Sequence, residues 1–218
     1  MGAMAGRLVS VNVGAPTSAS WADADDGRSG IDKRPAAGPV RVAPAGVVGD
    51  FIGNLRVHGG ADQAAYAYAR EDAAWWEREL GHEIRPGAFG ENLSTQGVDV
   101  TGAVIGERWA AGTALLEVSM PRTPCTVFAG FWDVPDLIKR FTAHGAPGAY
   151  LRVVRAGVVT AGDPVEVVDR PAHGVTIGTT FRALNGEPEL LPALLAATQL
   201  PKAVRDKVHR RLTGAVRP

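Results

Sequence analysis

The chain has 218 residues and a mass of 22.8 kDa, enough for one large domain, or a main domain with a small appendage, around a sizeable core. Lysine plus arginine and aspartate plus glutamate number 23 each, so no overall charge points to nucleic acid or to a membrane, and any anion site must be local. A single cysteine excludes an intramolecular disulfide and a cysteine-rich zinc site, and since we find no secretory leader and no long apolar span, we expect a cytoplasmic protein.

The N-terminal part of the chain predicts short strands joined by turns. The 27 glycines and 15 prolines, with only 6% aromatic residues, favour this arrangement over a helix bundle. Residues 7–13 alternate apolar and polar side chains with a period of two and stop at Gly14, which is typical of a half-buried strand. We expect residues 15–30 to form a mobile surface loop, and residues 39–42 and 47–50 to form further short strands.

The clearest helix is predicted over residues 62–80. The aspartate at its start is a typical N-cap residue, the apolar positions that follow repeat at helical spacing, and Gly81 supplies a stop. Its aromatic face, Tyr68 with Trp75 or Trp76, is interpreted as core packing rather than as a cofactor pocket.

The middle of the chain returns to strand patterns. Residues 86–93 predict a loop with three breakers around one aromatic side chain, and residues 104–118 predict two strands separated by a turn at Ala111-Gly112. A second helix is predicted over residues 133–144. Strands are expected again at residues 149–154 and 164–168.

The chain after Pro171 has a helical pattern. Pro188 and Pro201 each stand where a helix can begin, and stripes of leucine and valine follow them. The last eighteen residues are rich in lysine and arginine, which is typical of the solvated face of a terminal helix, although such a cluster can also bind nucleic acid or a partner protein. We therefore predict an α+β protein, mainly β, in which a β body carries a small C-terminal helical appendage.

Cys125 is the first candidate for chemistry. An apolar strand pattern precedes it, and two prolines, Pro121 and Pro124, stiffen the loop that would present its thiol. Arg122 places positive charge near a sulfur that reacts or binds metal only as thiolate. The alternative is a structural cysteine that packs as a small apolar side chain. The flanking arginine and prolines favour a functional role.

Four loops carry groups that suit an anionic organic ligand. Lys33 and Arg34 stand together at a turn, and His58 precedes Gly59 and Gly60, whose uncovered backbone amides can form an anion-binding nest. The other two loops hold Asn92, with Glu91 before it, and Arg122 beside Cys125. Each loop alone is a weak signal, but the four together suggest a binding site.

The five histidines show no spacing typical of a zinc site, so zinc is not expected. A thiolate can instead supply one bond to a soft-ligand metal whose other ligands come with an organic cofactor. The competing chemistry is a Cys–His nucleophilic site that pairs Cys125 with His58 or His144. The sequence leaves both open. It contains no Walker loop, no dinucleotide-binding glycine motif and no nucleophile elbow.

Taken together, these loops resemble the MOSC family, the C-terminal domain type of molybdenum cofactor sulfurases, and within it the stand-alone bacterial members. Several motifs in the right order and spacing carry this resemblance over residues 7–170, which makes it a strong signal. The motifs are Gly30-Ile31-Asp32-Lys33-Arg34-Pro35, Gly46-Val47-Val48-Gly49-Asp50, His58-Gly59-Gly60-Ala61-Asp62-Gln63-Ala64, Pro86-Gly87-Ala88-Phe89-Gly90-Glu91-Asn92-Leu93, Pro121-Arg122-Thr123-Pro124-Cys125 and Tyr150-Leu151-Arg152-Val153.

The resemblance implies a closed MOSC-type β-barrel with flanking helices over residues 7–170, followed by a three-helix extension over residues 175–214. It also implies a bound molybdenum cofactor (molybdopterin), with Cys125 at the position that ligates the metal. The positions expected near the pterin or the metal are Lys33, Arg34, His58, Gly59, Gly60, Asn92, Arg122 and Arg152.

The implied activity is the reduction of N-hydroxylated compounds, such as hydroxylaminopurine-like bases, to amines. Cleaving the N–O bond needs two electrons and two protons. No flavin, haem or iron–sulfur motif is present, so a separate reductase is expected to donate the electrons, while His58 or Glu91 is a candidate proton donor. No nucleic acid or membrane partner is expected, and the oligomeric state is left open.

Two alternatives keep the same residues in different roles: a sulfur carrier with a persulfide on Cys125, and a module that binds a cofactor or anion without turnover. One position departs from the family pattern. Many stand-alone members have paired histidines before the Gly-Gly step, whereas here Val57 precedes His58. If the missing imidazole contacts substrate or cofactor, we expect a different specificity or activity.

Overall fold

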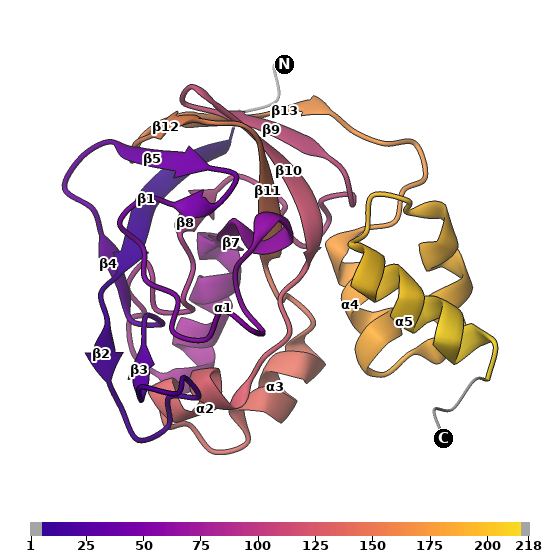
Figure 1. Ribbon diagram of the computed structural model, residues 1–218, viewed down its shortest axis with the longest axis horizontal. Helices are drawn as coiled ribbons and strands as arrows, with labels where there is room; N and C mark the ends of the chain where they lie inside the picture. Colours follow the sequence, from indigo (N-terminus) through magenta and orange to yellow (C-terminus); the bar gives the residue numbers. More distant parts are fainter. Residues whose placement is uncertain (1–5, 215–218) are drawn as a thin grey trace.

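The computed structural model describes residues 6–214, and its body is a closed β-barrel of seven strands (Figure 1). The strand order is β13-β9-β10-β11-β7-β8-β1, and β13 pairs with β1 to close the ring. All neighbours are antiparallel except β7 and β8. The strands are β1 (Gly6–Gly14), β7 (Ala65–Ala69), β8 (Leu93–Gln96), β9 (Arg108–Ala111), β10 (Ala114–Pro121), β11 (Ala149–Arg155) and β13 (Pro164–Asp169). The predicted barrel with flanking helices is confirmed.

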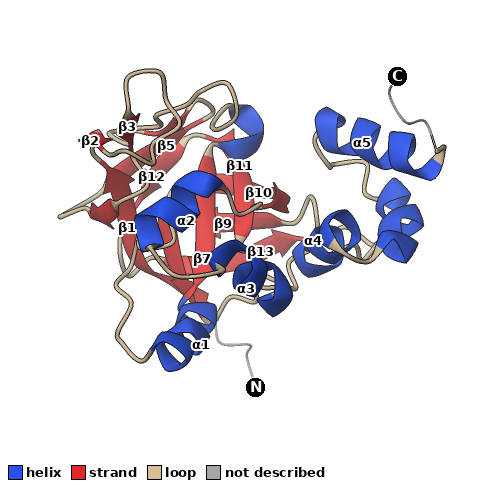
Figure 2. Ribbon diagram, turned by 90° about the horizontal axis from the view of Figure 1, so that it is seen from below, coloured by secondary structure: helices blue, strands red, loops and turns tan. Residues whose placement is uncertain are grey.

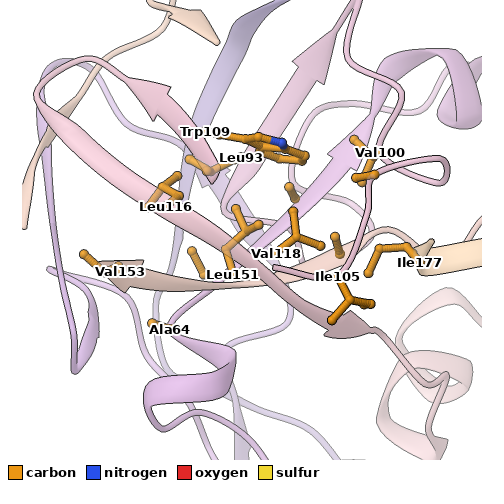
Figure 3. Close-up of a cluster of buried hydrophobic side chains, with 14 of the residues drawn as sticks. Ala64, Leu93, Val100, Ile105, Trp109, Leu116, Val118, Leu151, Val153 and Ile177 are labelled. Carbon is orange, nitrogen blue, oxygen red and sulfur yellow. The ribbon is translucent and has the colours of Figure 1, made fainter. Parts of the chain in front are cut away.

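Apolar side chains fill the inside of the barrel (Figure 3). The burial pattern of β10 alternates along most of the strand, so that Leu116 and Val118 point inward. Its partners contribute Trp109 and Leu151, each at most 1% exposed. Because the interior is packed with side chains, a ligand site must lie outside it, among the loops.

The predicted helix over residues 62–80 is wrong in its first half. Residues 61–63 form a short 3-10 turn, η1 (Ala61–Gln63), and β7 follows as a barrel strand between β11 and β8, before α1 (Arg70–Leu80) begins. All five residues of β7 are buried, so its alternating alanines and tyrosines fit a strand that is covered on both faces. The N-cap of α1 is Ala69 rather than Asp62, while Gly81 ends the helix as predicted.

The aromatic side chains predicted as core do form a core. Tyr68 stacks on Phe89 with ring centroids 4.2 Å apart, and Trp76 is fully buried in the same cluster. This cluster joins α1 to two helices that follow Cys125, α2 (Thr126–Trp132) and α3 (Leu137–His144).

The helix α2 was not predicted, and the helix predicted over residues 133–144 begins four residues later, at Leu137. Asp133 and Asp136 separate the two helices, and both have a left-handed backbone, with φ of 48° and 55°. The missed signal is the short apolar run after Cys125, which is too brief for a helical period to stand out.

The expected surface loop at residues 15–30 contains a small hairpin, β2 (Thr17–Ser18) with β3 (Arg28–Ser29). The strand β4 (Lys33–Pro35) extends the sheet next to β1. A separate three-stranded sheet contains β5 (Val40–Ala43), β6 (Gly46–Val47) and β12 (Gly157–Val159). The strand predicted at residues 47–50 is therefore shorter than expected, since β6 ends at Val47.

The C-terminal part is helical, as predicted, with α4 (Ile177–Asn185), the 3-10 segment η2 (Pro188–Ala196) and α5 (Lys202–Leu212) (Figure 2). Ile177, Leu191 and Val208 belong to the same apolar cluster as the barrel interior. The division into domains at residues 7–170 and 175–214 stays a prediction.

Along α5, Val208 is buried and the lysines and arginines are exposed, which fits the predicted solvated face. The last four residues of that basic stretch, 215–218, lie outside the described part of the chain. None of the helices between residues 6 and 214 combines the length and the apolar composition that a membrane span needs.

Candidate functional site

A cavity of about 120 Å³ opens beside the barrel, and loops far apart in the sequence line it. This is roughly ten times the volume that one bound water needs, so the cavity has room for part of an organic ligand. It is the place where most of the predicted loops meet. Its lining includes Asp23, Arg28, Gly30, Lys33, Asp50, Phe51, Ile52, Asn54, His58, Gly59, Gln63, Tyr66, Asn92, Arg122, Cys125 and Tyr150.

Cys125 stands at the end of the loop that follows β10, directly before the first turn of α2. Its side chain is half-buried, and it is a free thiol. Burial opposes ionisation, but hydrogen bonding by His58 and the charge of Arg122 outweigh it, so the pKa of Cys125 lies below its usual value. Cys125 and His58 both line the cavity.

Arg122 is a buried cation without a carboxylate partner. The residue is 5% exposed, and no acidic side chain among residues 6–214 forms an ion pair with it. Its guanidinium carbon lies 4.0 Å from the centre of the Phe128 ring and 5.6 Å from that of Tyr66. Its Nη1 atom is buried with no hydrogen-bond partner in the described part of the chain. Such a charge is costly unless an anion joins it.

Lys33 is also buried, but its charge is paired. Its Nζ atom lies 2.5 Å from both carboxylate oxygens of Asp50, and the two side chains are 9% and 6% exposed. Burial lowers the pKa of Lys33, and the charge of Asp50 opposes this shift. Asp50 also accepts hydrogen bonds from the backbone N–H of Gly14 and from Nδ2 of Asn92. This network joins three of the loops that line the cavity.

The loop from Gly87 to Asn92 is fixed by Glu91, whose carboxylate points into the loop itself. It accepts hydrogen bonds from the backbone N–H groups of Gly87 and Phe89 and from the hydroxyl of Ser94. Burial raises the pKa of Glu91, and these bonds oppose the shift. Glu91 does not line the cavity. Gly87 has a φ of 85°, and a Cβ there would lie 2.4 Å from the carbonyl oxygen of Lys33, so the close approach requires glycine.

Six of the predicted site residues line this cavity and three do not. Those in the lining are Lys33, His58, Gly59, Asn92, Arg122 and Cys125. Arg34 is exposed and pairs with Asp32, and Gly60 lies outside the lining. Arg152 pairs with Asp62 and Glu117 on a barrel strand.

Two other positions raised by the sequence also lie outside. His144, the alternative partner for Cys125, stacks on Trp75 with ring centroids 3.8 Å apart and lines a different cavity. Val57, where the resemblance leads us to expect a second histidine, is 58% exposed and does not line the Cys125 cavity.

Several lining residues had no role in the sequence reasoning, and among them are Asp50, Gln63, Tyr66 and Tyr150. Tyr150 lines the cavity together with Arg122 and Cys125, and burial raises the pKa of its hydroxyl. The Oε1 atom of Gln63 is buried with no hydrogen-bond partner in the described part of the chain. Asp50, Gln63 and Tyr150 stand in three of the motifs that carry the family resemblance, which is the signal that could have found them.

No group of three or more histidine, cysteine, aspartate or glutamate side chains within residues 6–214 is arranged to hold a metal ion. A protein-only metal cage is therefore absent from this part of the chain. Cys125 supplies one sulfur donor in the cavity, which fits a metal whose remaining ligands belong to an organic cofactor.

The MOSC domain family model matches residues 54–166 of the chain. Among related sequences, Protein YiiM of Escherichia coli (strain K12) is 33% identical over 196 residues, covering 86% of this chain and 87% of that protein. Uncharacterized protein YflK of Bacillus subtilis (strain 168) is 32% identical over 170 residues, covering 78% and 76%. A Gibberella moniliformis protein named Reductase is 32% identical over 177 residues, covering 79% of this chain but 31% of that longer protein.

Solved structures agree with these matches. The crystal structure of YiiM from Geobacillus stearothermophilus superposes with a TM-score of 0.79 at 31% identity, covering 95% of this chain and 99% of that one. The crystal structure of YiiM from Escherichia coli superposes with a TM-score of 0.72 at 29% identity, covering 85% and 90%.

Proposed function

The chain belongs to the MOSC domain family, and from that premise we propose that it is an oxidoreductase that binds a molybdenum cofactor (molybdopterin) and reduces N-hydroxylated compounds to amines. The observation that carries the proposal is the juxtaposition of a buried, unpaired Arg122 with the Cys125 thiol in one cavity. The relative named Reductase supports the reaction class.

The residues in the cavity fit such a cofactor. Arg122 offers a guanidinium that can bind a phosphate oxygen, and the charge that it carries has no partner within the described protein. The lowered pKa of Cys125 favours the thiolate, which is the form that binds a soft metal. Arg122 would thus hold the anionic part of the cofactor, and Cys125 would supply a sulfur ligand. When bound, the metal supplies two-electron exchange.

The chain's own residues would orient the reacting groups and handle the protons. Reduction of R–NHOH breaks the N–O bond, consumes two electrons and two protons, and releases R–NH₂ and water. His58 lines the cavity beside Cys125, so we assign it the proton donation to the departing oxygen. Glu91 is less suited, because its carboxylate is bound by its own loop. The electrons would come from a separate reductase, as the implied activity requires.

A turnover assay tests this function. Protein purified from a host that makes molybdopterin is supplied with a chemical electron donor and 6-N-hydroxylaminopurine, and amine formation is followed by chromatography. We expect turnover by the wild type and at least a tenfold loss in Cys125→Ser. The variant Arg122→Met removes the cation in the cavity. Its matched control is Arg41→Met, which makes the same change at an exposed position on β5. Cofactor-loaded wild type that forms no amine would contradict the proposal and favour a binding module without turnover.

A sulfur carrier is the second candidate, because a half-buried thiol with a lowered pKa is also suited to hold a persulfide. Intact mass spectrometry separates the two. The carrier role predicts a mass increase of one sulfur atom that disappears in Cys125→Ser and on reduction, in protein free of metal. The reductase role predicts metal and pterin without that increase.

A further inference from the structure

The Cys125 cavity holds one carboxamide side chain that the protein leaves unused. Within residues 6–214 the carboxamides in its lining are Asn54, Gln63 and Asn92. Asn92 accepts a hydrogen bond from a backbone N–H group and donates to a backbone carbonyl and to Asp50. Asn54 accepts one from a backbone N–H group and donates to a backbone carbonyl. Both asparagines therefore hold loops of the cavity wall together.

The side chain of Gln63 makes no contact of this kind. Its Oε1 atom is buried with no hydrogen-bond partner in the described chain, and its Nε2 atom donates no hydrogen bond there. A carboxamide offers an acceptor oxygen beside two N–H donors, and buried polar groups without partners are rare in folded proteins. The last side-chain torsion of glutamine is soft, so the amide can turn toward a ligand. We therefore expect a ligand to supply the missing partners.

The backbone that carries Gln63 is fixed, so the free amide is held in place before a ligand arrives. The backbone N–H of Gln63 donates to the carbonyl oxygen of Gly60 at 3.0 Å, across the start of η1. The preceding Asp62 is held twice. Its carbonyl oxygen accepts a hydrogen bond from the Ser119 hydroxyl at 2.5 Å, and its carboxylate pairs with Arg152 at 2.6 Å. A ligand therefore has to order only the side chain of Gln63, which lowers the entropy cost of binding.

The free amide complements a ligand edge in which an N–H group stands beside an acceptor nitrogen. Glutamine forms two parallel hydrogen bonds with such an edge on adenine, through its oxygen and its NH₂ group. A hydroxylamino group on a purine presents the same edge, because its N–H lies next to a ring nitrogen. An alkyl hydroxylamine or an N-oxide lacks the ring nitrogen, the N–H, or both. Gln63 is uncharged, so it suits this neutral edge, whereas Arg122 suits an anion.

We propose that Gln63 determines substrate specificity, by recognising the N–H group and the neighbouring ring nitrogen of an N-hydroxylated amino-heterocycle. The inference rests on the proposed function, from which it takes the reacting hydroxylamino group. That group has to reach the metal site at Cys125, and Gln63 lines the same cavity. The pterin of the cofactor carries a similar edge, so the experiment has to separate the two sources.

Isothermal titration calorimetry on the cofactor-loaded protein tests this recognition without turnover. The probes are 6-aminopurine, which presents the edge, and 6-dimethylaminopurine, which has no N–H on its exocyclic nitrogen. We expect the wild type to bind 6-aminopurine at least tenfold more tightly, about 1.4 kcal/mol. In Gln63→Met this preference should disappear, because methionine fills a similar space without the amide. The matched control is Gln96→Met, which makes the same change at an exposed position on β8 outside the lining.

Turnover and cofactor content give two further measurements. The ratio of kcat/KM for 6-N-hydroxylaminopurine to that for phenylhydroxylamine, which lacks the ring nitrogen, should fall at least tenfold in Gln63→Met and keep its wild-type value in Gln96→Met. Pterin fluorescence after oxidation should give equal pterin content in all three proteins. A tenfold loss of pterin in Gln63→Met alone would overturn the proposal, because the amide would then hold the cofactor rather than the substrate.

The same preference between the two purines in wild type and Gln63→Met, or no binding of 6-aminopurine by the wild type, would also overturn the proposal. The proposed function and this inference fail separately. Wild type that binds 6-aminopurine through Gln63 but forms no amine contradicts the reductase and supports the recognition. Turnover with an unchanged kcat/KM ratio in Gln63→Met contradicts only the recognition.

Discussion

Two buried cations line the Cys125 cavity, and they differ in what surrounds them. The ammonium group of Lys33 contacts both carboxylate oxygens of Asp50. Asp50 also accepts hydrogen bonds from the backbone N–H of Gly14 and from Nδ2 of Asn92. Arg122 lies over the ring of Phe128 and has no carboxylate within the described chain. Both residues come from motifs that the sequence marked as candidates for anion binding.

The difference separates a structural charge from a functional one. A buried cation loses several kcal/mol of hydration, and a carboxylate in good geometry offsets most of this loss. A cation–π contact contributes about 0.5–2 kcal/mol, which is too little to do the same for Arg122. The fold therefore retains Arg122 at a cost in stability, whereas the Lys33–Asp50 pair holds loops together. We infer that the anionic ligand is bound chiefly through Arg122.

The largest effect should come from removing the partner of Lys33. In Asp50→Asn the ammonium stays buried without its counter-charge, so we expect the free energy of unfolding to fall by about 3 kcal/mol. Urea denaturation followed by circular dichroism measures it. A fall of less than about 1 kcal/mol would mean that the pair is not structural, and the comparison with Arg122 would fail.

A double variant should recover much of that loss. Lys33→Met removes the buried charge, so Lys33→Met with Asp50→Asn should be more stable than Asp50→Asn alone by about 2 kcal/mol. Full recovery is not expected, because Asp50 also accepts bonds from Gly14 and Asn92. A double-mutant cycle under the same conditions gives the coupling energy, and strictly additive losses would contradict the pairing.

Arg122 should behave in the opposite way. Arg122→Met replaces an unpaired buried charge by an apolar side chain of similar length, so the protein without cofactor should be as stable as the wild type or more stable by about 1 kcal/mol. Anion binding should fall at least tenfold. The same urea experiment provides the stability. A loss of stability comparable to that of Asp50→Asn would show that Arg122 is structural after all.

The smallest predicted effect concerns the thiol. Because the pKa of Cys125 is lowered, its alkylation rate by iodoacetamide should reach half of its maximum at a lower pH than that of an ordinary cysteine. The midpoint should move to higher pH in Arg122→Met and in His58→Gln, since each removes a group that favours the thiolate. Cys125 is the sole cysteine, so the label reports on it alone. An unshifted midpoint in both variants would show that neither Arg122 nor His58 lowers the pKa of the Cys125 thiol.

The sequence predicted five of the seven barrel strands, all but β7 and β8, and the presentation of Cys125, because those features are local. Period-two alternation in residues 7–13 and 164–168 marks strands, but nothing local shows that Gly6 pairs with Val165 to close the barrel. The misassigned helix has a similar cause. The alternating alanines and tyrosines of β7 are compatible with a helix until the flanking strands bury both faces.

The candidate site shows the same limit. Lys33, Arg34, Arg122 and Arg152 are equivalent as basic residues in motifs, and only the fold shows their surroundings. Arg34 and Arg152 pair with carboxylates outside the cavity, and Asp50 reaches Lys33 from seventeen residues away. Arg122 is the one cation of these four that forms no ion pair with a carboxylate of the described chain. The sequence alone could not show this.

The most direct test of the account is the molybdenum and pterin content of protein purified from a host that makes molybdopterin. Metal is measured by mass spectrometry and pterin by fluorescence after oxidation, for wild type, Cys125→Ser, Arg122→Met and the control Arg41→Met. The account predicts near-stoichiometric molybdenum and pterin in the wild type and the control, with at least a tenfold loss of metal in Cys125→Ser and of both in Arg122→Met. Wild-type protein without molybdenum, or equal content in all four proteins, would contradict it.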